Sequence, residues 1–122
     1  MRTVATFVGA ATIATAALGP APVAWADMQA AFTNTIVSRY PNGKWVKHFF
    51  EPGGGYRAEF QDGRRMTAHW AVEGDQVCLT NIRPVSILRR YCTPLVEADI
   101  GDTWPARDPL GRRVSNTLVA GR

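Results

Sequence analysis

Turn-forming residues recur about every eight to twelve positions through most of this 122-residue chain. The segments between them are short, β-rich and interrupted too often to form long helices. The turns lie at Pro41-Asn42-Gly43, Pro52-Gly53-Gly54-Gly55, Gln61-Asp62-Gly63, Glu73-Gly74-Asp75, Asn81 to Ser86 and Asp108-Pro109-Leu110-Gly111. This spacing predicts an all-β domain of about six to eight short antiparallel strands. A helical turn is expected only at residues 27–32.

The hairpin around Gly63 can be placed in register from the sequence. A three-residue loop with Gly63 in the left-handed conformation pairs Phe60 with Arg64. This register gathers apolar side chains on one face, namely Tyr56, Ala58, Phe60, Met66, Ala68, Trp70 and Val72. Glu59 and Arg65 then meet on the other face, as an opposite-charge pair worth up to about 1 kcal/mol. A two-residue loop would mix apolar and charged residues on one face, so the apolar pattern rejects it.

The following strands extend the pattern and bring two cysteines together. A two-residue turn at Gly74-Asp75 sets Val77 and Leu79 on the apolar face, so Cys78 points the other way. We expect Cys78 and Cys92 to be cross-strand neighbours joined by a disulfide, which closes a loop of about 15 residues and contributes roughly 3 kcal/mol. The alternative is two free thiols, one of them reactive or metal-binding.

Two similar segments lie at the ends of the predicted domain, Asn34-Thr35-Ile36-Val37-Ser38 and Asn116-Thr117-Leu118-Val119-Ala120. Chance explains a five-residue match, but the segments also suit a first and a last strand that meet. Such a meeting would close the meander into a lipocalin-like barrel and remove its exposed edges. A two-sheet β-sandwich is the alternative architecture, and we expect a monomer in either case.

The first 26 residues have the three-part layout of a secretory signal peptide. Arg2 gives the positive start, an uncharged Ala- and Thr-rich stretch follows, and Ala24-Trp25-Ala26 is a small-x-small cleavage site. The apolar run is shorter than the about 20 residues that span a bilayer, and no transmembrane segment is expected. We therefore expect cleavage after Ala26 and a single domain over residues 27–122, in the periplasm or secreted. That oxidising compartment favours the disulfide.

The formal net charge is +4, and basic and acidic residues are intermixed along the sequence. A nucleic-acid-binding domain normally gathers Lys and Arg on one face, and export disfavours nucleic acid further, so we expect no such partner. Anionic envelope material, such as lipopolysaccharide or peptidoglycan, suits a basic exported protein better. An ordinary solvated surface is the simpler interpretation.

No motif in the sequence indicates a catalytic residue, a metal site or a cofactor. A zinc site normally needs three or four protein ligands, whereas His48 and His69 are the only histidines and their strands are not neighbours. The Gly-x-Ser-x-Gly turn of many hydrolases is absent, and Gly53-Gly54-Gly55 precedes a strand instead of the helix that follows a phosphate-binding loop. The sequence favours a protein without enzymatic activity; the alternative is a small periplasmic hydrolase that uses His48 or His69.

Four residues are candidates for a binding surface. Trp45 and Phe49 lie in a segment that is apolar on both strand faces, which fits either burial on both sides or an exposed recognition patch. Arg64 and Arg89 share the parity of the apolar face but lie near strand ends, so they are candidates for the rim of a barrel mouth. Solvated rims are the simpler interpretation of these arginines.

The run from Trp70 to Leu79, with Tyr91-Cys92 and the tail Gly101-Asp102-Thr103-Trp104, resembles a pattern in small exported proteobacterial proteins of unassigned function. The resemblance covers half of the predicted mature chain. It implies a β-rich fold in the cell envelope and carries over no catalytic residue.

These features predict a non-catalytic envelope or secreted binding domain, in one of two forms. An inhibitor-like protein would grip a protein partner, such as a protease or lysozyme, with a rigid loop at residues 52–55 or 81–86 above a filled core. A carrier would hold a small apolar ligand in a pocket of a few hundred Å3 that opens at one end of the barrel.

Overall fold

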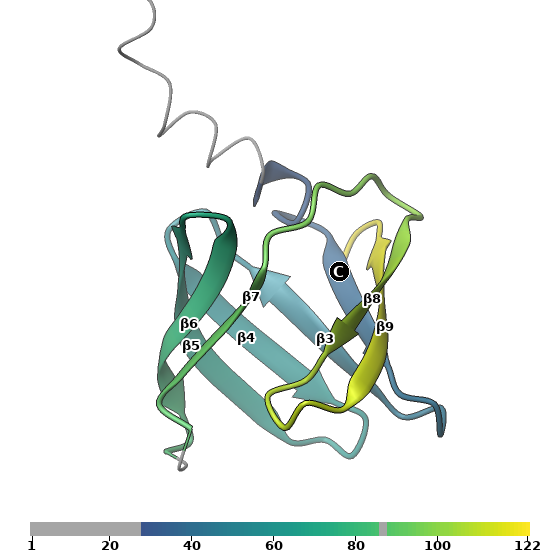
Figure 1. Cartoon of the computed structure of the whole chain (residues 1–122), viewed down its shortest axis with the longest axis horizontal. Coiled ribbons are helices and arrows are strands. Elements are labelled where there is room, and N and C mark those ends of the chain that lie inside the picture. Colours follow the sequence, from purple (N-terminus) through teal and green to yellow (C-terminus); the bar gives the residue numbers. More distant parts are fainter. Residues whose placement is uncertain (1–27, 86–87) are drawn as a thin grey trace, which may run out of the picture.

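The computed structural model describes residues 28–85 and 88–122 and confirms the all-β class (Figure 1). Eight antiparallel strands form one sheet that curls into a nearly closed barrel. The strands are β2 (Thr35–Arg39), β3 (Trp45–Phe50), β4 (Gly55–Phe60), β5 (Arg65–Glu73), β6 (Gln76–Arg83), β7 (Arg90–Pro94), β8 (Thr103–Arg107) and β9 (Arg113–Val119). The predicted signal peptide and its cleavage site lie outside the described residues.

The first and last strands pair, but their pairing does not close the barrel. Thr35 of β2 faces Val119 of β9, and Ile36 faces Leu118, as the similar end segments indicate. The strand order is β7-β6-β5-β4-β3-β2-β9-β8, so β8 extends the sheet beyond β9 and the two edges are β7 and β8. The Tyr91 hydroxyl of β7 donates to the carbonyl oxygen of Arg107 in β8, at 2.5 Å, across the seam between these edges.

The register predicted for the central strands is confirmed. Tyr56 faces Ala68 and Glu59 faces Arg65 across the β4–β5 hairpin. Gly63 has the required positive φ of 92° in the connecting turn. Glu59 forms its ion pair with Arg57 of its own strand, at 3.7 Å, and not with Arg65 as predicted.

The two cysteines are joined as expected. Val72 faces Val77 across the β5–β6 turn, and Cys78 faces Cys92 across β6 and β7. A disulfide bond links the two cysteines. It therefore fastens edge strand β7 to its neighbour.

Strand β6 is longer than the turn pattern predicted. The pairing of β5 with β6 shifts by one position between Thr67 and His69, and Asn81 takes up the extra residue with a φ of 52°. The strand then resumes, and Ile82 is buried in the core. Residues 81–83 are thus part of a strand, and the loop predicted at 81–86 starts later.

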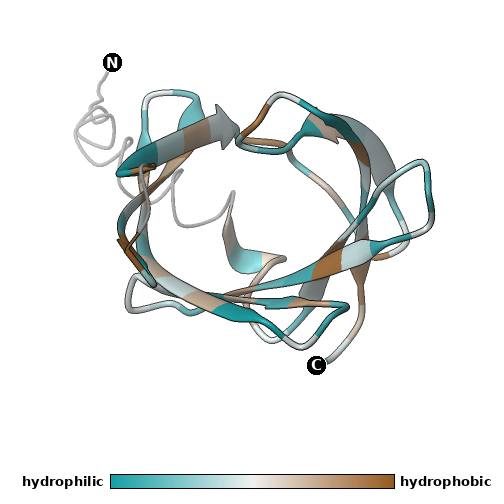
Figure 2. Cartoon of the chain, turned by 90° about the horizontal axis from the view of Figure 1, so that it is seen from below, coloured by the Kyte–Doolittle hydropathy of each residue, from teal (hydrophilic) through white to brown (hydrophobic). Residues whose placement is uncertain are grey.

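The barrel interior holds the core, and a helical turn covers one end of it. The predicted apolar face points inward, with Tyr56, Ala58 and Ala68 buried. Residues 28–32 make the expected helical turn, in which the Ala31 N–H donates to the Met28 carbonyl at 2.9 Å. Met28 and Phe32 of this turn are buried in the core, and Figure 2 shows the turn inside the ring of strands.

Candidate functional site

The barrel interior is incompletely filled and contains a cavity of about 220 Å3. Its wall is mostly apolar and includes Ile36, Val46, Phe50, Phe60, Met66 and Leu79. Ala30 and Ala31 of the helical turn close one end, and Tyr40, Asp108 and Pro109 lie at the other. Both edge strands contribute, since Tyr91 and Thr93 come from β7 and Trp104 and Ala106 from β8.

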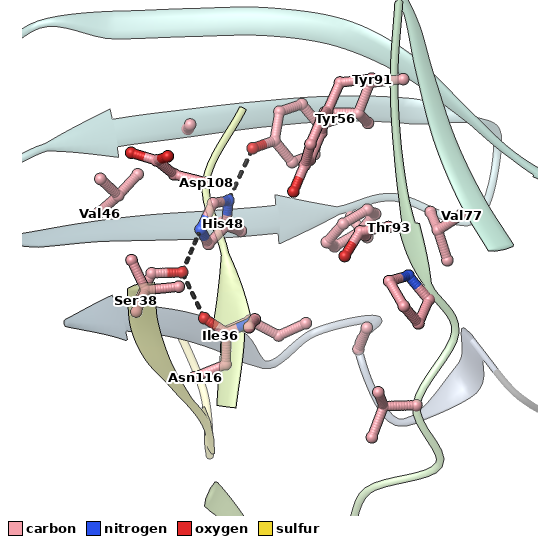
Figure 3. Close-up of a pocket in the computed structure, with 18 of the residues that line it drawn as sticks. Ile36, Ser38, Val46, His48, Tyr56, Val77, Tyr91, Thr93, Asp108 and Asn116 are labelled. Carbon is pink, nitrogen blue, oxygen red and sulfur yellow. Dashed lines mark hydrogen bonds between the residues drawn. The ribbon is translucent and has the colours of Figure 1, made fainter. Parts of the chain in front are cut away.

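A hydrogen-bonded row of four polar side chains crosses this apolar wall, one from each of four neighbouring strands (Figure 3). The Tyr56 hydroxyl lies 2.7 Å from His48 Nδ1, and His48 Nε2 lies 2.8 Å from Ser38 Oγ. Ser38 Oγ donates to Asn116 Oδ1 at 2.6 Å.

The hydrogen bonds of this row are all donated in the same direction, from Tyr56 toward Asn116. Because Ser38 gives its single hydroxyl proton to Asn116, its oxygen accepts the proton on His48 Nε2. Nδ1 of the neutral imidazole is then an acceptor, and Tyr56 donates to it. This direction gives the polar hydrogens of Tyr56, His48 and Ser38 an acceptor each and gives Asn116 Oδ1 a donor.

Burial keeps the four side chains of this row uncharged at neutral pH. The His48 side chain is enclosed by the barrel and reached by solvent only partly, through the cavity, and this desolvation lowers its pKa to about 4. Desolvation likewise raises the pKa of Tyr56 far above its usual value, with a smaller contribution from Tyr91. These four side chains therefore give the cavity wall neutral hydrogen-bonding groups, whereas the charged lining residues Arg107 and Asp108 belong to β8 and the turn after it.

The Ser38–His48 contact has the length of a nucleophile–base pair but not its arrangement. A general base must accept the nucleophile's proton, whereas Ser38 directs its proton to Asn116. The imidazole is oriented by the Tyr56 hydroxyl and not by a carboxylate as in a catalytic triad. Neither histidine contacts a carboxylate within residues 28–85 and 88–122.

A buried carboxylate instead organises the turn between β8 and β9. Asp108 accepts hydrogen bonds from the Tyr40 hydroxyl at 2.9 Å and from Arg112 Nε at 2.8 Å. Burial alone would raise the pKa of Asp108, but hydrogen bonds from the Arg112 backbone, Tyr40 and the Arg112 guanidinium hold it below its usual value. Asp108 therefore stays ionised and pins this turn against Tyr40.

The four predicted binding residues do not form one site. Phe49 is 4% exposed on the outer face, because the guanidinium of Arg57 lies 4.0 Å from its ring centroid and Arg122 covers it further. This agrees with burial on both sides of the segment. Trp45 and Arg64 share a separate, open depression, where Arg64 pairs with Asp62 at 2.8 Å. Arg89 is exposed just before β7.

The two histidines point to opposite faces of the sheet. His48 faces the cavity and His69 is exposed on the outside. Across the described part of the chain, no three His, Cys, Asp or Glu side chains gather in a metal-binding group. The sequence reading missed Ser38, Tyr56 and Asn116 as partners of His48; the pairing of β3 with β2 and β4 is the signal that brings them together.

Comparisons of the chain with family models, with curated proteins and with solved structures gave no match. The resemblance to small exported proteins therefore stays a prediction. None of the helices in the described residues is long and apolar enough to cross a membrane.

Proposed function

We propose that this domain binds a small, mainly apolar ligand inside its barrel, as a carrier does. The observation that carries the proposal is the cavity of about 220 Å3, with its mostly apolar wall and its hydrogen-bonded row of four neutral polar side chains. Small-molecule sites typically combine such a wall with a few placed polar groups. An apolar cavity of about 150 Å3 already binds benzene, so this volume suits a ring or a short acyl chain.

Small side chains keep the cavity open. Ala58 lies between His48 and Met66 in one cross-strand row, and Ala106 faces Val114 near the seam. Protein interiors are normally close-packed, and larger residues at these positions would fill the space. An inhibitor that presents a rigid loop gains nothing from such a space, and this favours the carrier over the inhibitor.

The seam between β7 and β8 supports a route for the ligand. Every other pair of neighbouring strands is joined by a hydrogen-bonded ladder. In the part of the chain that the structure describes, the Tyr91–Arg107 hydrogen bond joins the two edges, and both edges line the cavity. Separation of β7 from β8 therefore disrupts less backbone pairing than any other opening of the barrel.

Export belongs to the same proposal. The Cys78–Cys92 disulfide is compatible with an oxidising compartment. The layout of residues 1–26 adds a signal peptide, so the protein would act in the periplasm or outside the cell. The mass of the protein recovered from the host should then correspond to a chain that starts at Asp27; a full-length chain would contradict export by this route.

Binding can be tested with the probe N-phenyl-1-naphthylamine, whose emission rises in apolar surroundings. The protein should bind the probe, and Ala58→Leu and Ala106→Leu should each weaken binding about tenfold or more because the added atoms occupy the cavity. Ala71→Leu adds the same atoms on the outer face and is the matched control. Unchanged binding in both cavity variants, or no binding by the parent protein, would overturn the proposal.

A further inference from the structure

The charged residues separate toward the two ends of the barrel. Because neighbouring strands are antiparallel, the connections at 40–44, 61–64 and 108–112 and the described residues 84–85 and 88–89 all lie at one end, the lower end in Figure 1. With the adjoining strand termini, at 39–45, 60–65, 83–90 and 107–113, this basic end carries ten Lys and Arg residues and two Asp residues. Both of these Asp residues are already paired, Asp62 with Arg64 and Asp108 with Arg112.

The opposite, acidic end has the reverse composition. It comprises the helical turn and the connections at 51–54, 74–75, 95–102 and 120–122. Its acidic residues, with Glu73 at the end of β5, are Glu51, Glu73, Asp75, Glu97, Asp99 and Asp102. Arg122 is the basic residue here, and it pairs with Glu51, while Glu73 pairs with Arg90 at the start of β7. The molecule therefore has an electrical polarity along the barrel axis that its small net charge conceals.

Most cations of the basic end are available to a partner. Seven of them form no ion pair with a carboxylate of the described residues, and all seven are exposed: Arg39, Lys44, Arg65, Arg83, Arg89, Arg107 and Arg113. They are distributed over all four connections and so form a ring. Such a ring matches an extended anionic surface better than a single small anion.

Two aliphatic side chains project from the same end. Val85, before β7, is 75% exposed, and Leu110, in the β8–β9 turn, is 74% exposed. Aliphatic side chains among cations suit a lipid surface, where the charges meet headgroups and the apolar atoms enter the acyl boundary. A nucleic acid would use the charges but would gain little from exposed aliphatic tips, since its bases stack on aromatic groups.

We propose that the basic end docks on an anionic lipid surface, with Leu110 and Val85 directed into it. The docking residues are separate from the cavity variants used above, so this inference stands or falls independently of ligand binding. Each Lys or Arg close to an anionic membrane changes binding about fivefold. Seven available cations therefore supply enough attraction for measurable, salt-sensitive docking.

The test is sedimentation of the purified protein with vesicles of phosphatidylcholine alone or with phosphatidylglycerol added. We expect binding to the anionic vesicles that disappears at high salt. Arg65→Gln with Arg89→Gln should weaken this binding about tenfold to thirtyfold. The matched control, Gln29→Glu with Gln76→Glu, changes the net charge equally at the acidic end and should have a much smaller effect.

The aliphatic contribution has its own matched pair. Leu110→Ser should weaken binding severalfold, whereas Ile100→Ser, which is 58% exposed at the acidic end, should not. Three results would overturn the proposal: no binding to anionic vesicles, equal binding to neutral ones, or equal losses in the two double variants. Equal losses would mean that the net charge, and not the basic end, governs association.

Discussion

The two ends of this barrel are built in different ways. At the acidic end the chain folds back on itself: Met28 and Phe32 of the helical turn are buried in the core, and Arg122 donates to the Phe50 carbonyl at 2.8 Å. At the basic end, short connections return the chain between strands, and Val85 and Leu110 extend into solvent.

The two kinds of end separate the part of the molecule that stabilises the fold from the part that is exposed to a partner. Buried apolar groups and bonds between distant segments stabilise the acidic end, so substitutions there should cost free energy of unfolding. Exposed cations at the basic end contribute little to folding, because surface charge pairs are typically worth up to about 1 kcal/mol. Substitutions at the basic end can therefore change the binding of a partner with little effect on the stability of the fold.

The largest difference in the free energy of unfolding is expected when one apolar side chain is removed at each end. Phe32→Ala should lower the free energy of unfolding by about 3–5 kcal/mol, since it empties a buried ring site beside Trp70. Leu110→Ala should change it by less than about 0.5 kcal/mol. Urea denaturation followed by tryptophan fluorescence measures both; similar costs would remove the distinction between the ends.

The buried His48 in the barrel interior makes the free energy of unfolding depend on pH, a contribution that neither end of the barrel makes in the same way. The pKa of His48 is lowered to about 4 in the fold and is about 6.5 in the unfolded chain, so the unfolded state binds more protons between these values. Stability should therefore be fully present above pH 6.5 and fall by about 3 kcal/mol as the pH drops to 4.

A comparison of His48→Gln with His69→Gln measures this term by denaturation at several pH values. The first variant should lose most of the slope between pH 4 and 6.5, and the second should keep it, because His69 is exposed. An unchanged slope in His48→Gln would show that the buried imidazole is not its origin.

A smaller difference in stability is expected between two arginine substitutions, one at each end of the barrel. Arg122→Ala should cost about 1–2 kcal/mol, because its guanidinium bonds Glu51 and the Phe50 carbonyl and also covers Phe49. Arg113→Ala at the basic end should cost less than about 0.5 kcal/mol. The two thermal midpoints report this difference, and equal losses would contradict the view that the acidic end is the fastened one.

Much of the fold could be predicted because local chemistry fixes it. The Gly63 loop sets the β4–β5 register, and a period of two then assigns the faces as far as Tyr91. The disulfide was predicted from the two cysteines and the expected oxidising compartment, and the assumption of this bond extends the register from Leu79 to Tyr91. Strand β8 was harder to anticipate, since its pairing with β9 places it beyond the expected closure and leaves β7 and β8 as edges.

The candidate site was less accessible to sequence reasoning. Ser38 and Asn116 reach His48 through β2, which pairs with both β3 and β9, and the second pairing joins opposite ends of the chain. The charge separation follows from alternation: connections that are neighbours in sequence lie at opposite ends of the barrel, so charges intermixed along the chain become sorted in space. The cavity depends on side-chain volumes across all strands, which no local pattern reports.

Ligand binding in the interior is tested most directly by methyl NMR of the alanine side chains during titration with 1-octanol. We expect saturable shifts of the methyl signals of Ala58 and Ala106, which line the cavity, and no shift of the methyl signal of Ala71 on the outer face. Shifts at Ala71 alone, or no saturable shift at either cavity alanine, would contradict this expectation.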